Sequence, residues 1–277
     1  MLGLLPTSVI LAAAPESCHH ANVRVLRSFG FVDVSGFTAL TEHEGDEQAV
    51  EVLTAFRALL RDICSRRGVR IAKWLGDGVM LVCVDTAPLL ATILELHHVV
   101  HALSATDDRV SIRSGITSGQ VILMEGDDYI GHCVNVAARL CDMAQGGEAL
   151  ADPSVVDRLP RWGIVLGHRD VVLRGVDKPV HTSSIGMAED VTSKVRSRDP
   201  ICGLPLCDDT AEAIATDHKG SSVLFCSNGC LDTWQHRPGR QRPSDTGAGA
   251  GVGAGGSAST TAPPSTSTDK GAAQVGL

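Results

Sequence analysis

The chain has 277 residues, a length typical of one or two domains. Its 24 Lys and Arg against 32 Asp and Glu give a formal net charge of −8, which argues against binding to nucleic acid or an anionic membrane surface by bulk positive charge. Hydrophobic residues make up 43% of the chain and aromatic residues only 3%, so the core must consist mainly of Val, Leu, Ile and Ala. The first 15 residues carry no charge, but they are too short to span a bilayer and lack the basic start of a secretory signal. We therefore predict a cytoplasmic protein with no membrane span and no nucleic-acid partner.

Composition divides the chain into five segments. Residues 1–23 are an N-terminal extension, and residues 24–187 alternate strand and helix patterns. Residues 188–198 are polar and mixed in charge, as linkers are, and residues 199–237 contain a cysteine cluster. In residues 238–277, 30 of the 40 residues are Gly, Ala, Ser, Thr or Pro and none is aromatic. Such a segment buries too little apolar surface to offset its ordering entropy, so we expect a disordered tail.

The first half of the larger region predicts a strand, a helix and a hairpin. Residues 25–34 are a mainly apolar strand that ends in a Gly-containing turn. Residues 41–68 predict one amphipathic helix, because apolar side chains recur at i, i+3, i+4 and i+7. Residues 69–74 and 79–84 are two β-rich runs, and the Asp-Gly pair between them is a strong hairpin signal.

The second half completes a recognisable order of elements. Residues 87–103 predict a second helix, residues 110–116 and 120–124 two further strands, and residues 132–144 a third helix. The order βαββαβ is that of a ferredoxin-like α+β fold. We expect the helices to cover one face of an antiparallel sheet and to leave the other face free for a partner or ligand.

Three carboxylates stand at the ends or turns of these strands. Asp33 closes the first strand, Asp77 lies at the hairpin tip, and Asp128 precedes the third helix. The first and third strands of a βαββαβ sheet are neighbours, so Asp33 and Asp77 should converge. Two converging carboxylates suit two Mg²⁺ or Mn²⁺ ions and a polyphosphate. The alternative is that Asp77 serves only the turn, where Asp is common.

Other polar residues lie on predicted helices and strands. Asn135 and Arg139 stand four residues apart and share a helix face, where Arg suits a phosphate and Asn a sugar; a solvated face is the alternative. Lys73 lies near the end of an apolar strand, either as an edge-strand charge or as a donor to a base or phosphate. His97 and His101 share a face of the second helix, and we interpret them as polar-face residues rather than metal ligands.

Four segments that carry these residues resemble the catalytic domain of class III nucleotidyl cyclases. They are FVDVSGFT at residues 31–38, KWLGDG at 73–78, RSGITSG at 113–119 and DYIGHCVNVAAR at 128–139. Their order and spacing agree throughout residues 24–187. The resemblance implies a two-metal attack of the ribose 3′-oxygen on the α-phosphorus, with release of pyrophosphate.

The resemblance also implies a role for each position that binds substrate or metal. Asp33 and Asp77 match the two aspartates that hold the Mg²⁺ or Mn²⁺ ions, and Lys73 and Asp128 match the pair that reads the purine edge. Lys73 can donate to adenine N1 and Asp128 can accept from its N6 amino group, whereas guanine presents the reverse polarity. The pair therefore favours ATP over GTP, and the Glu and Cys-like residues of guanylate cyclases are missing at these positions.

The remaining matched positions imply a dimer. Asn135 matches the residue on the ribose and Arg139 the residue on the phosphates in the transition state, and Arg174 aligns loosely with a phosphate-binding Lys. In the family, this catalytic pair comes from the second subunit of a head-to-tail dimer, so a homodimer would hold two sites. We expect an adenylate cyclase; the alternatives are a guanylate cyclase and a catalytically silent, cyclase-like dimer that acts as a metal sensor or scaffold.

The C-terminal cysteine cluster resembles a YHS or TRASH-type metal-binding domain. That resemblance implies that Cys202, Cys226 and Cys230 bind Zn²⁺ or another soft metal ion, with Cys207 or His218 as a candidate fourth ligand. A segment of this size has too little core to fold easily without a metal or another crosslink. A regulatory metal sensor, a purely structural zinc site and a disulfide are the three interpretations.

Overall fold

The computed structural model describes residues 24–104, 110–124, 128–176, 178–188 and 197–237. The predicted N-terminal extension, most of the predicted linker and the predicted C-terminal tail lie outside these residues. All the described residues belong to one compact unit.

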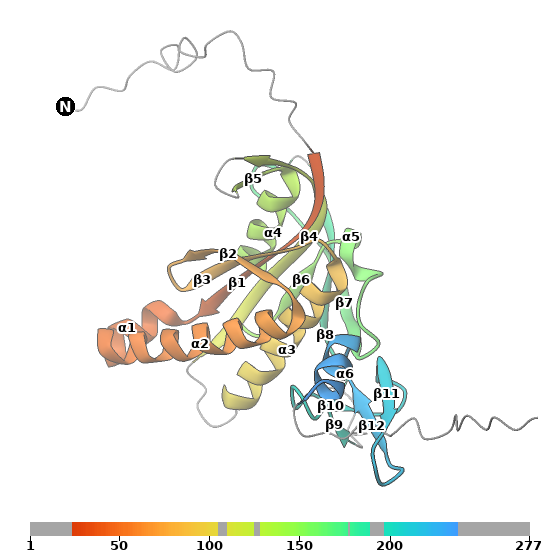
Figure 1. Ribbon diagram of the computed structural model, residues 1–277. Coiled ribbons are helices and arrows are strands. Elements are labelled where there is room, and N and C mark those ends of the chain that lie inside the picture. Colours follow the sequence, from red (N-terminus) through yellow and green to blue (C-terminus); the bar gives the residue numbers. More distant parts are fainter. Residues whose placement is uncertain (1–23, 105–109, 125–127, 177, 189–196, 238–277) are drawn as a thin grey trace, which may run out of the picture. The chain divides into compact units, whose positions relative to one another are not determined.

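An eight-stranded sheet forms the centre of the described chain (Figure 1). Its strands lie in the order β2-β3-β1-β4-β6-β8-β7, and β5 pairs with the end of β4. The strands are β1 (Arg24–Ser35), β2 (Arg70–Leu75), β3 (Gly78–Cys83), β4 (Ser111–Met124), β5 (Asp128–Ile130), β6 (Ala149–Ala151), β7 (Gly163–Val171) and β8 (Val180–Met187). The neighbours β2-β3-β1-β4 have the predicted ferredoxin-like arrangement, which confirms the α+β fold.

The helices follow the predicted order with one difference. They are α1 (Phe37–Glu44), α2 (Asp46–Arg67), α3 (Thr86–Ser104), α4 (His132–Met143), α5 (Pro153–Val156) and α6 (Asn228–Gln235). The single helix predicted over residues 41–68 is in fact divided between α1 and α2. Gly45 separates the two helices with φ of 89° and ψ of 168°, a conformation that a residue with a side chain rarely adopts.

The two strands predicted at residues 110–116 and 120–124 are one continuous strand, β4. It pairs antiparallel with β1 at every position from Ser111, opposite Ser35, to Ile122, opposite Arg24. The small polar residues in its middle resemble a turn locally. Their pairing with β1 satisfies the hydrogen-bond donors and acceptors of the backbone. The strand pairing therefore outweighs the local preference of these residues for a turn.

Alternating residues of β1 face two separate apolar clusters. Val32 and Val34 pack in the cluster that contains α2 and α3, whereas Phe29 packs in a cluster with Cys133 and Ala137 of α4. Helix α4 therefore covers part of the face that was expected to be free. Its close approach is possible because Gly115 of β4 has no side chain there: a Cβ on it would lie 2.2 Å from the Ala137 carbonyl oxygen.

The cysteine-containing segment adds two short hairpins and a helix. Strand β9 (Ser197–Arg198) pairs with β10 (Pro205–Leu206), and β11 (Ala213–Thr216) pairs with β12 (Ser222–Phe225) before α6 begins. Its buried Leu206 and Phe225 belong to the same apolar cluster as Leu60 and Ile63 of α2. The indole nitrogen of the fully buried Trp162 donates to the Cys226 carbonyl oxygen at 3.0 Å. The segment therefore shares its core with the larger sheet.

Among the described residues, no helix is both long enough and apolar enough to cross a membrane.

Replacing Gly115 with Ala tests the contact between α4 and the sheet. The added Cβ would lie 2.3 Å from the Cys141 backbone nitrogen and would force α4 away from β4. Overpacking of this kind costs about 1–3 kcal/mol, which urea denaturation would measure. Gly167→Ala is the matched control, because nothing lies within 4 Å of a Cβ there. Equal stability of the two variants would contradict the described packing.

Candidate active site

Asp33 lies at the end of β1 beside the tip of the β2–β3 hairpin. The β1–β3 register pairs Val32 with Val79, so the next position on β1 lies opposite Gly78. A Cβ on Gly78 would lie 3.2 Å from Asp33 Oδ1 and 3.2 Å from the Val32 carbonyl oxygen. The structure thus places Asp33 next to the residue that follows Asp77. The hairpin approaches this closely because position 78 is glycine, where a side chain would crowd both oxygen atoms.

Arg113 holds the other oxygen of Asp33. The two residues are direct partners across β1 and β4, and the guanidinium donates to Asp33 Oδ2 at 2.7 and 2.9 Å. Hydrogen bonding to Asp33 raises the pKa of Arg113 above its ordinary value. Arg113 is not among the site residues predicted from the sequence. Only the strand register reveals that it faces Asp33, although its place in a matched motif was a signal.

Lys73 and Asp128 lie in contact, although 55 positions separate them in the chain. Lys73 Nζ on β2 donates to Asp128 Oδ1 on β5 at 2.8 Å. Both side chains are about half exposed, at 48% and 52%. The hydrogen bond from Lys73, with a second from the Tyr129 backbone, holds the pKa of Asp128 below its usual value. The pair offers one donor and one acceptor to a molecule in solvent.

Helix α2 supports the hairpin that carries Lys73 and Asp77. Arg57 Nη2 donates to the Gly76 carbonyl oxygen at 2.8 Å, directly before Asp77. The guanidinium groups of Arg57 and Arg61 lie 4.9 and 5.3 Å from the ring centre of Trp74. These cation–π contacts and the hydrogen bond fix the hairpin tip against α2.

Asn135 and Arg139 lie on α4, which its buried Val136 and Leu140 anchor to the sheet. Asn135 is exposed and Arg139 is half-buried. Neither side chain has a hydrogen-bond partner among the described residues, and neither is brought into contact with the Lys73–Asp128 pair. Arg174 is exposed in the turn between β7 and β8.

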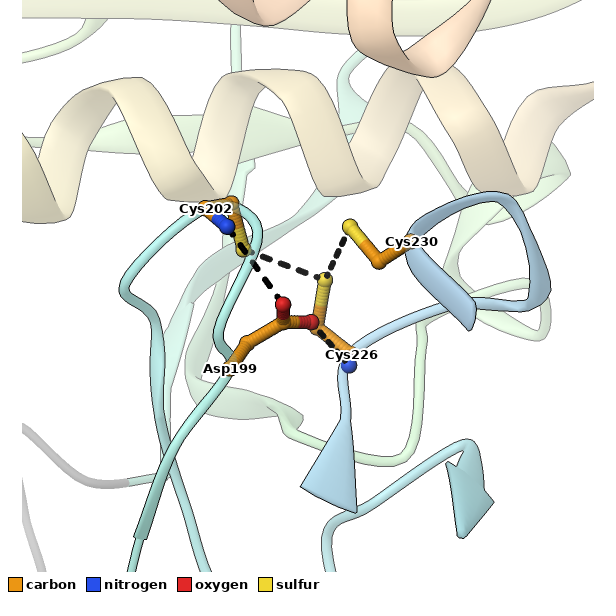
Figure 2. A group of neighbouring side chains, drawn as sticks. All are labelled: Asp199, Cys202, Cys226 and Cys230. Carbon is orange, nitrogen blue, oxygen red and sulfur yellow. Dashed lines mark hydrogen bonds between the residues drawn. The ribbon is translucent and has the colours of Figure 1, made fainter. Parts of the chain in front are cut away.

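Four side chains of the C-terminal segment converge in a second site (Figure 2). The ligand atoms of Asp199, Cys202, Cys226 and Cys230 all lie within 4.8 Å of one another. The Sγ atom of Cys226 is 3.5 Å from that of Cys202 and 3.6 Å from that of Cys230, and these cysteines are free thiols.

The fourth group of this cluster differs from the one expected. Neither candidate from the sequence belongs to it: Cys207 instead contacts the Thr210 hydroxyl at 3.4 Å, and His218 is exposed. Asp199 was missed because a carboxylate beside Pro is common in turns. Its position three residues before Cys202 was the available signal.

Buried hydrogen bonds hold this cluster in place. Asp199 accepts from the backbone nitrogen of Ile201 through Oδ1 and from that of Cys226 through Oδ2, both at 2.8 Å. Burial raises the pKa of Asp199. Hydrogen bonds from Cys202 and Cys226 lower the pKa of the Cys230 thiol, which favours one thiolate in the group.

A buried ion-pair group lies against the cysteines. Glu95 of α3 is 1% exposed and accepts from Arg66 at 2.8 Å and from Arg67 at 2.6 Å. Arg67 Nη2 also donates to Cys226 Sγ at 3.2 Å. Burial alone would lower the pKa of Arg67, but the charges of Cys226 and Glu95 outweigh it and hold the pKa above the ordinary value. Arg67 thus joins α2, α3 and the cysteine cluster.

His97 lies between the polar helix face predicted for it and the core. Its side chain is half-buried, and its Nε2 lies 2.9 Å from the Ser114 hydroxyl. Burial lowers the pKa of His97 to about 4, so the imidazole is neutral at physiological pH. A neutral imidazole needs no counter-charge, so His97 can pack against the sheet from a helix face that also carries exposed polar residues.

Comparison with known proteins identifies the family of the larger region. Residues 19–182 match the family model of the adenylate and guanylate cyclase catalytic domain. The chain belongs to this family. An uncharacterised protein of Mycobacterium tuberculosis is 35% identical over 180 residues, which are 65% of this chain and 45% of that protein. A pH-sensitive adenylate cyclase of the same species is 38% identical over 130 residues, 47% of this chain and 31% of that protein.

A solved structure shows the same fold. The crystal structure of the guanylyl cyclase Cya2 covers 61% of this chain and 95% of its own, with a TM-score of 0.55 and 21% identity. The chain spans less than half the length of the two Mycobacterium tuberculosis relatives. Both adenylate and guanylate cyclases therefore stand among the similar proteins.

Neutralising Glu95 tests the ion-pair group. Glu95→Gln keeps the shape of the side chain but leaves Arg66 and Arg67 without their buried counter-charge. We expect a loss of about 3–5 kcal/mol in the free energy of unfolding, measured by urea denaturation. Asp62→Asn, which removes the 67% exposed partner of Arg66, should cost less than about 0.5 kcal/mol. Similar losses of unfolding free energy in the two variants would show that Glu95 does not balance the charges of Arg66 and Arg67.

Proposed function

We propose that this cyclase is an adenylate cyclase of the cytoplasm, which converts ATP into 3′,5′-cyclic AMP and pyrophosphate as a head-to-tail homodimer. The observation that carries the proposal is the contact between Lys73 Nζ and Asp128 Oδ1 at 2.8 Å. The 38% identity to an adenylate cyclase supports the same choice of substrate.

Lys73 and Asp128 are the proposed adenine-reading pair. Lysine only donates and an ionised aspartate only accepts, so the pair matches the N1 acceptor and the N6 amino donor of adenine. Guanine would place its N1–H against Lys73 and its O6 against Asp128, leaving both groups mismatched. The half-exposed side chains are accessible to a nucleotide without unfolding any buried element.

Asp33 and Asp77 are the proposed ligands of two Mg²⁺ or Mn²⁺ ions. These hard cations prefer carboxylate oxygens, and Gly78 leaves Asp33 Oδ1 uncrowded, because a Cβ at that position would lie 3.2 Å from it. When bound, the ions acidify the ribose 3′-hydroxyl and neutralise phosphate oxygens. Arg113 engages only Oδ2 of Asp33, so it orients the carboxylate while Oδ1 faces the hairpin.

Asn135 and Arg139 are proposed to complete the site of a second chain. Arg139 would stabilise the charge that develops on the α-phosphoryl group as its bond to pyrophosphate breaks, and Asn135 would orient the ribose. Their lack of partners among the described residues fits side chains that act across an interface. Exposed apolar side chains on the β4–β5 ribbon, Leu123, Met124 and Ile130, support an interface at that end of the sheet.

Two further groups have proposed supporting roles. Exposed Arg174 is proposed to bind the polyphosphate, as a permanent cation can. Residues 199–237 are proposed to be a YHS or TRASH-type module that binds a soft metal ion and regulates the cyclase.

The central experiment measures cyclic nucleotide formed from ATP or GTP by the purified full chain with Mn²⁺ or Mg²⁺. We expect cyclic AMP from ATP and none from Asp77→Ala, because one proposed metal ligand is lost. Asp33→Ala and Arg139→Ala should each be inactive, yet an equal mixture should recover about a quarter of the wild-type activity through one intact site per mixed dimer. A folded dimer that makes no product would favour the silent sensor or scaffold.

Exchanging the base-reading pair tests substrate choice. Lys73→Glu combined with Asp128→Cys reverses the donor and acceptor pattern, so the ratio of kcat/KM for GTP to that for ATP should rise by at least about tenfold. Lys178→Glu, an exposed lysine outside the site, is the control and should leave this ratio unchanged. A wild-type protein that already prefers GTP would refute the proposed role of the pair.

A further inference from the structure

We infer that Asp199, Cys202, Cys226 and Cys230 together hold one Zn²⁺ ion, or a cation of the same soft to borderline class, and that this ion controls the cyclase site through helix α2. The ion site and its link to α2 stand on contacts within the described residues. The effect on catalysis rests, in addition, on the cyclase function proposed above.

The cluster has the spacing and chemistry of a closed four-ligand metal site. A tetrahedral zinc ion with Zn–S bonds near 2.3 Å separates its sulfur ligands by about 3.8 Å. The observed Sγ–Sγ distances of 3.5 and 3.6 Å need only a small expansion. Three thiols cannot all form disulfides with one another, whereas one ion accepts all three. Asp199 supplies a fourth ligand, since its carboxylate keeps a free lone pair beside the three backbone hydrogen bonds from Ile201, Cys202 and Cys226.

Arg67 supplies the positive charge that such a site requires. A divalent ion with three thiolates and one carboxylate carries two excess negative charges, which are costly to bury without a nearby cation. The Arg67 side chain is 3% exposed and donates directly to Cys226 Sγ at 3.2 Å. Glu95 holds Arg67 from the other side, at 2.6 Å. The cyclase domain therefore provides the outer shell of a site whose ligands lie in the C-terminal segment.

Helix α2 joins this outer shell to the hairpin of the proposed active site. Arg67 is the last residue of α2, and Arg57 lies ten residues earlier on the same helix, about 15 Å along its axis. Arg57 donates to the Gly76 carbonyl oxygen and lies over the Trp74 ring. One rigid element is thus tied at its end to the cysteines and, nearer its middle, to the turn that carries Asp77.

Loss of the ion should therefore loosen the hairpin. Residues 199–237 pack their buried side chains into the core shared with α2, and an ion bound by four of these residues stabilises the folded segment further. Without it, the Cys226 contact with Arg67 and the packing of α6 against α2 weaken together. The ion-bound state is then the active state, because α2 holds Asp77 in position to bind Mg²⁺ or Mn²⁺ and Lys73 in position to bind the adenine base.

The first test measures metal binding and backbone protection, and does not require catalysis. The reduced, metal-free full chain is titrated with Zn²⁺ alone, in the presence of saturating Mg²⁺. We expect one zinc per chain, and slower amide hydrogen exchange at residues 70–83 when zinc is bound. Cys230→Ser should lose the ion, whereas Cys207→Ser, a cysteine of the same segment outside the cluster, should keep it. A zinc-bound wild type with unchanged exchange in the hairpin would overturn the link to α2.

The second test measures the response of activity. One equivalent of Zn²⁺ should raise cyclic AMP formation by wild type and by Cys207→Ser about fivefold or more, and should not raise that of Cys230→Ser. Arg57→Gln should bind zinc normally but lose the response, because the hydrogen bond to Gly76 is gone. A zinc response that persists in Cys230→Ser or Arg57→Gln would refute the inference. Absence of any cyclic nucleotide would refute the proposed function, while the exchange measurement would still decide the ion site and its link.

Discussion

The pairing of β1 with β3 on one side and β4 on the other is the constraint on which the candidate site depends. It places Asp33 beside Gly78 of the hairpin and directly opposite Arg113. Side chains alternate between the faces of a sheet, so a slip of one residue would send Asp33 into the core now occupied by Val32 and Val34. The apolar packing on both faces of β1 therefore fixes the position of a polar side chain at its end.

The buried group of Glu95, Arg66 and Arg67 has a similar role for the C-terminal segment. An ion pair in an apolar interior adds little net stability, since desolvation offsets much of its attraction. The group instead specifies how the two helices and the segment pack. Among the described residues, Arg66 and Arg67 share one buried counter-charge, Glu95, and Arg67 also donates to Cys226. The contact between Arg67 and Cys226 holds the cysteines of the segment against the end of α2.

The two proposed sites differ in how firmly they are held. The cysteine cluster is mostly buried, and backbone hydrogen bonds fix its carboxylate. Lys73 and Asp128 are half exposed and paired with each other, so a nucleotide base can replace one hydrogen bond with two. Asn135 and Arg139 lie on α4, whose buried side chains pack against the sheet. Neither of the two side chains has a hydrogen-bond partner among the described residues. This difference fits the proposals above, in which the cysteine cluster is a rigid metal site and the nucleotide site is completed by the substrate and a second chain.

The sequence by itself determined the order βαββαβ, the ferredoxin-like arrangement, the cyclase family and the candidate residues, because periodicity and motif spacing are local properties. Tertiary structure alone decided the rest. The break at Gly45, the continuity of β4 and the cover that α4 gives to the second face depend on long-range pairing and close packing. The partnership of Arg113 with Asp33, the contact of His97 with Ser114 and the presence of Asp199 among the cysteines depend on which distant residues meet. The spacing of residues along the chain does not predict these contacts, because strand register and side-chain packing bring the residues together only in the folded protein.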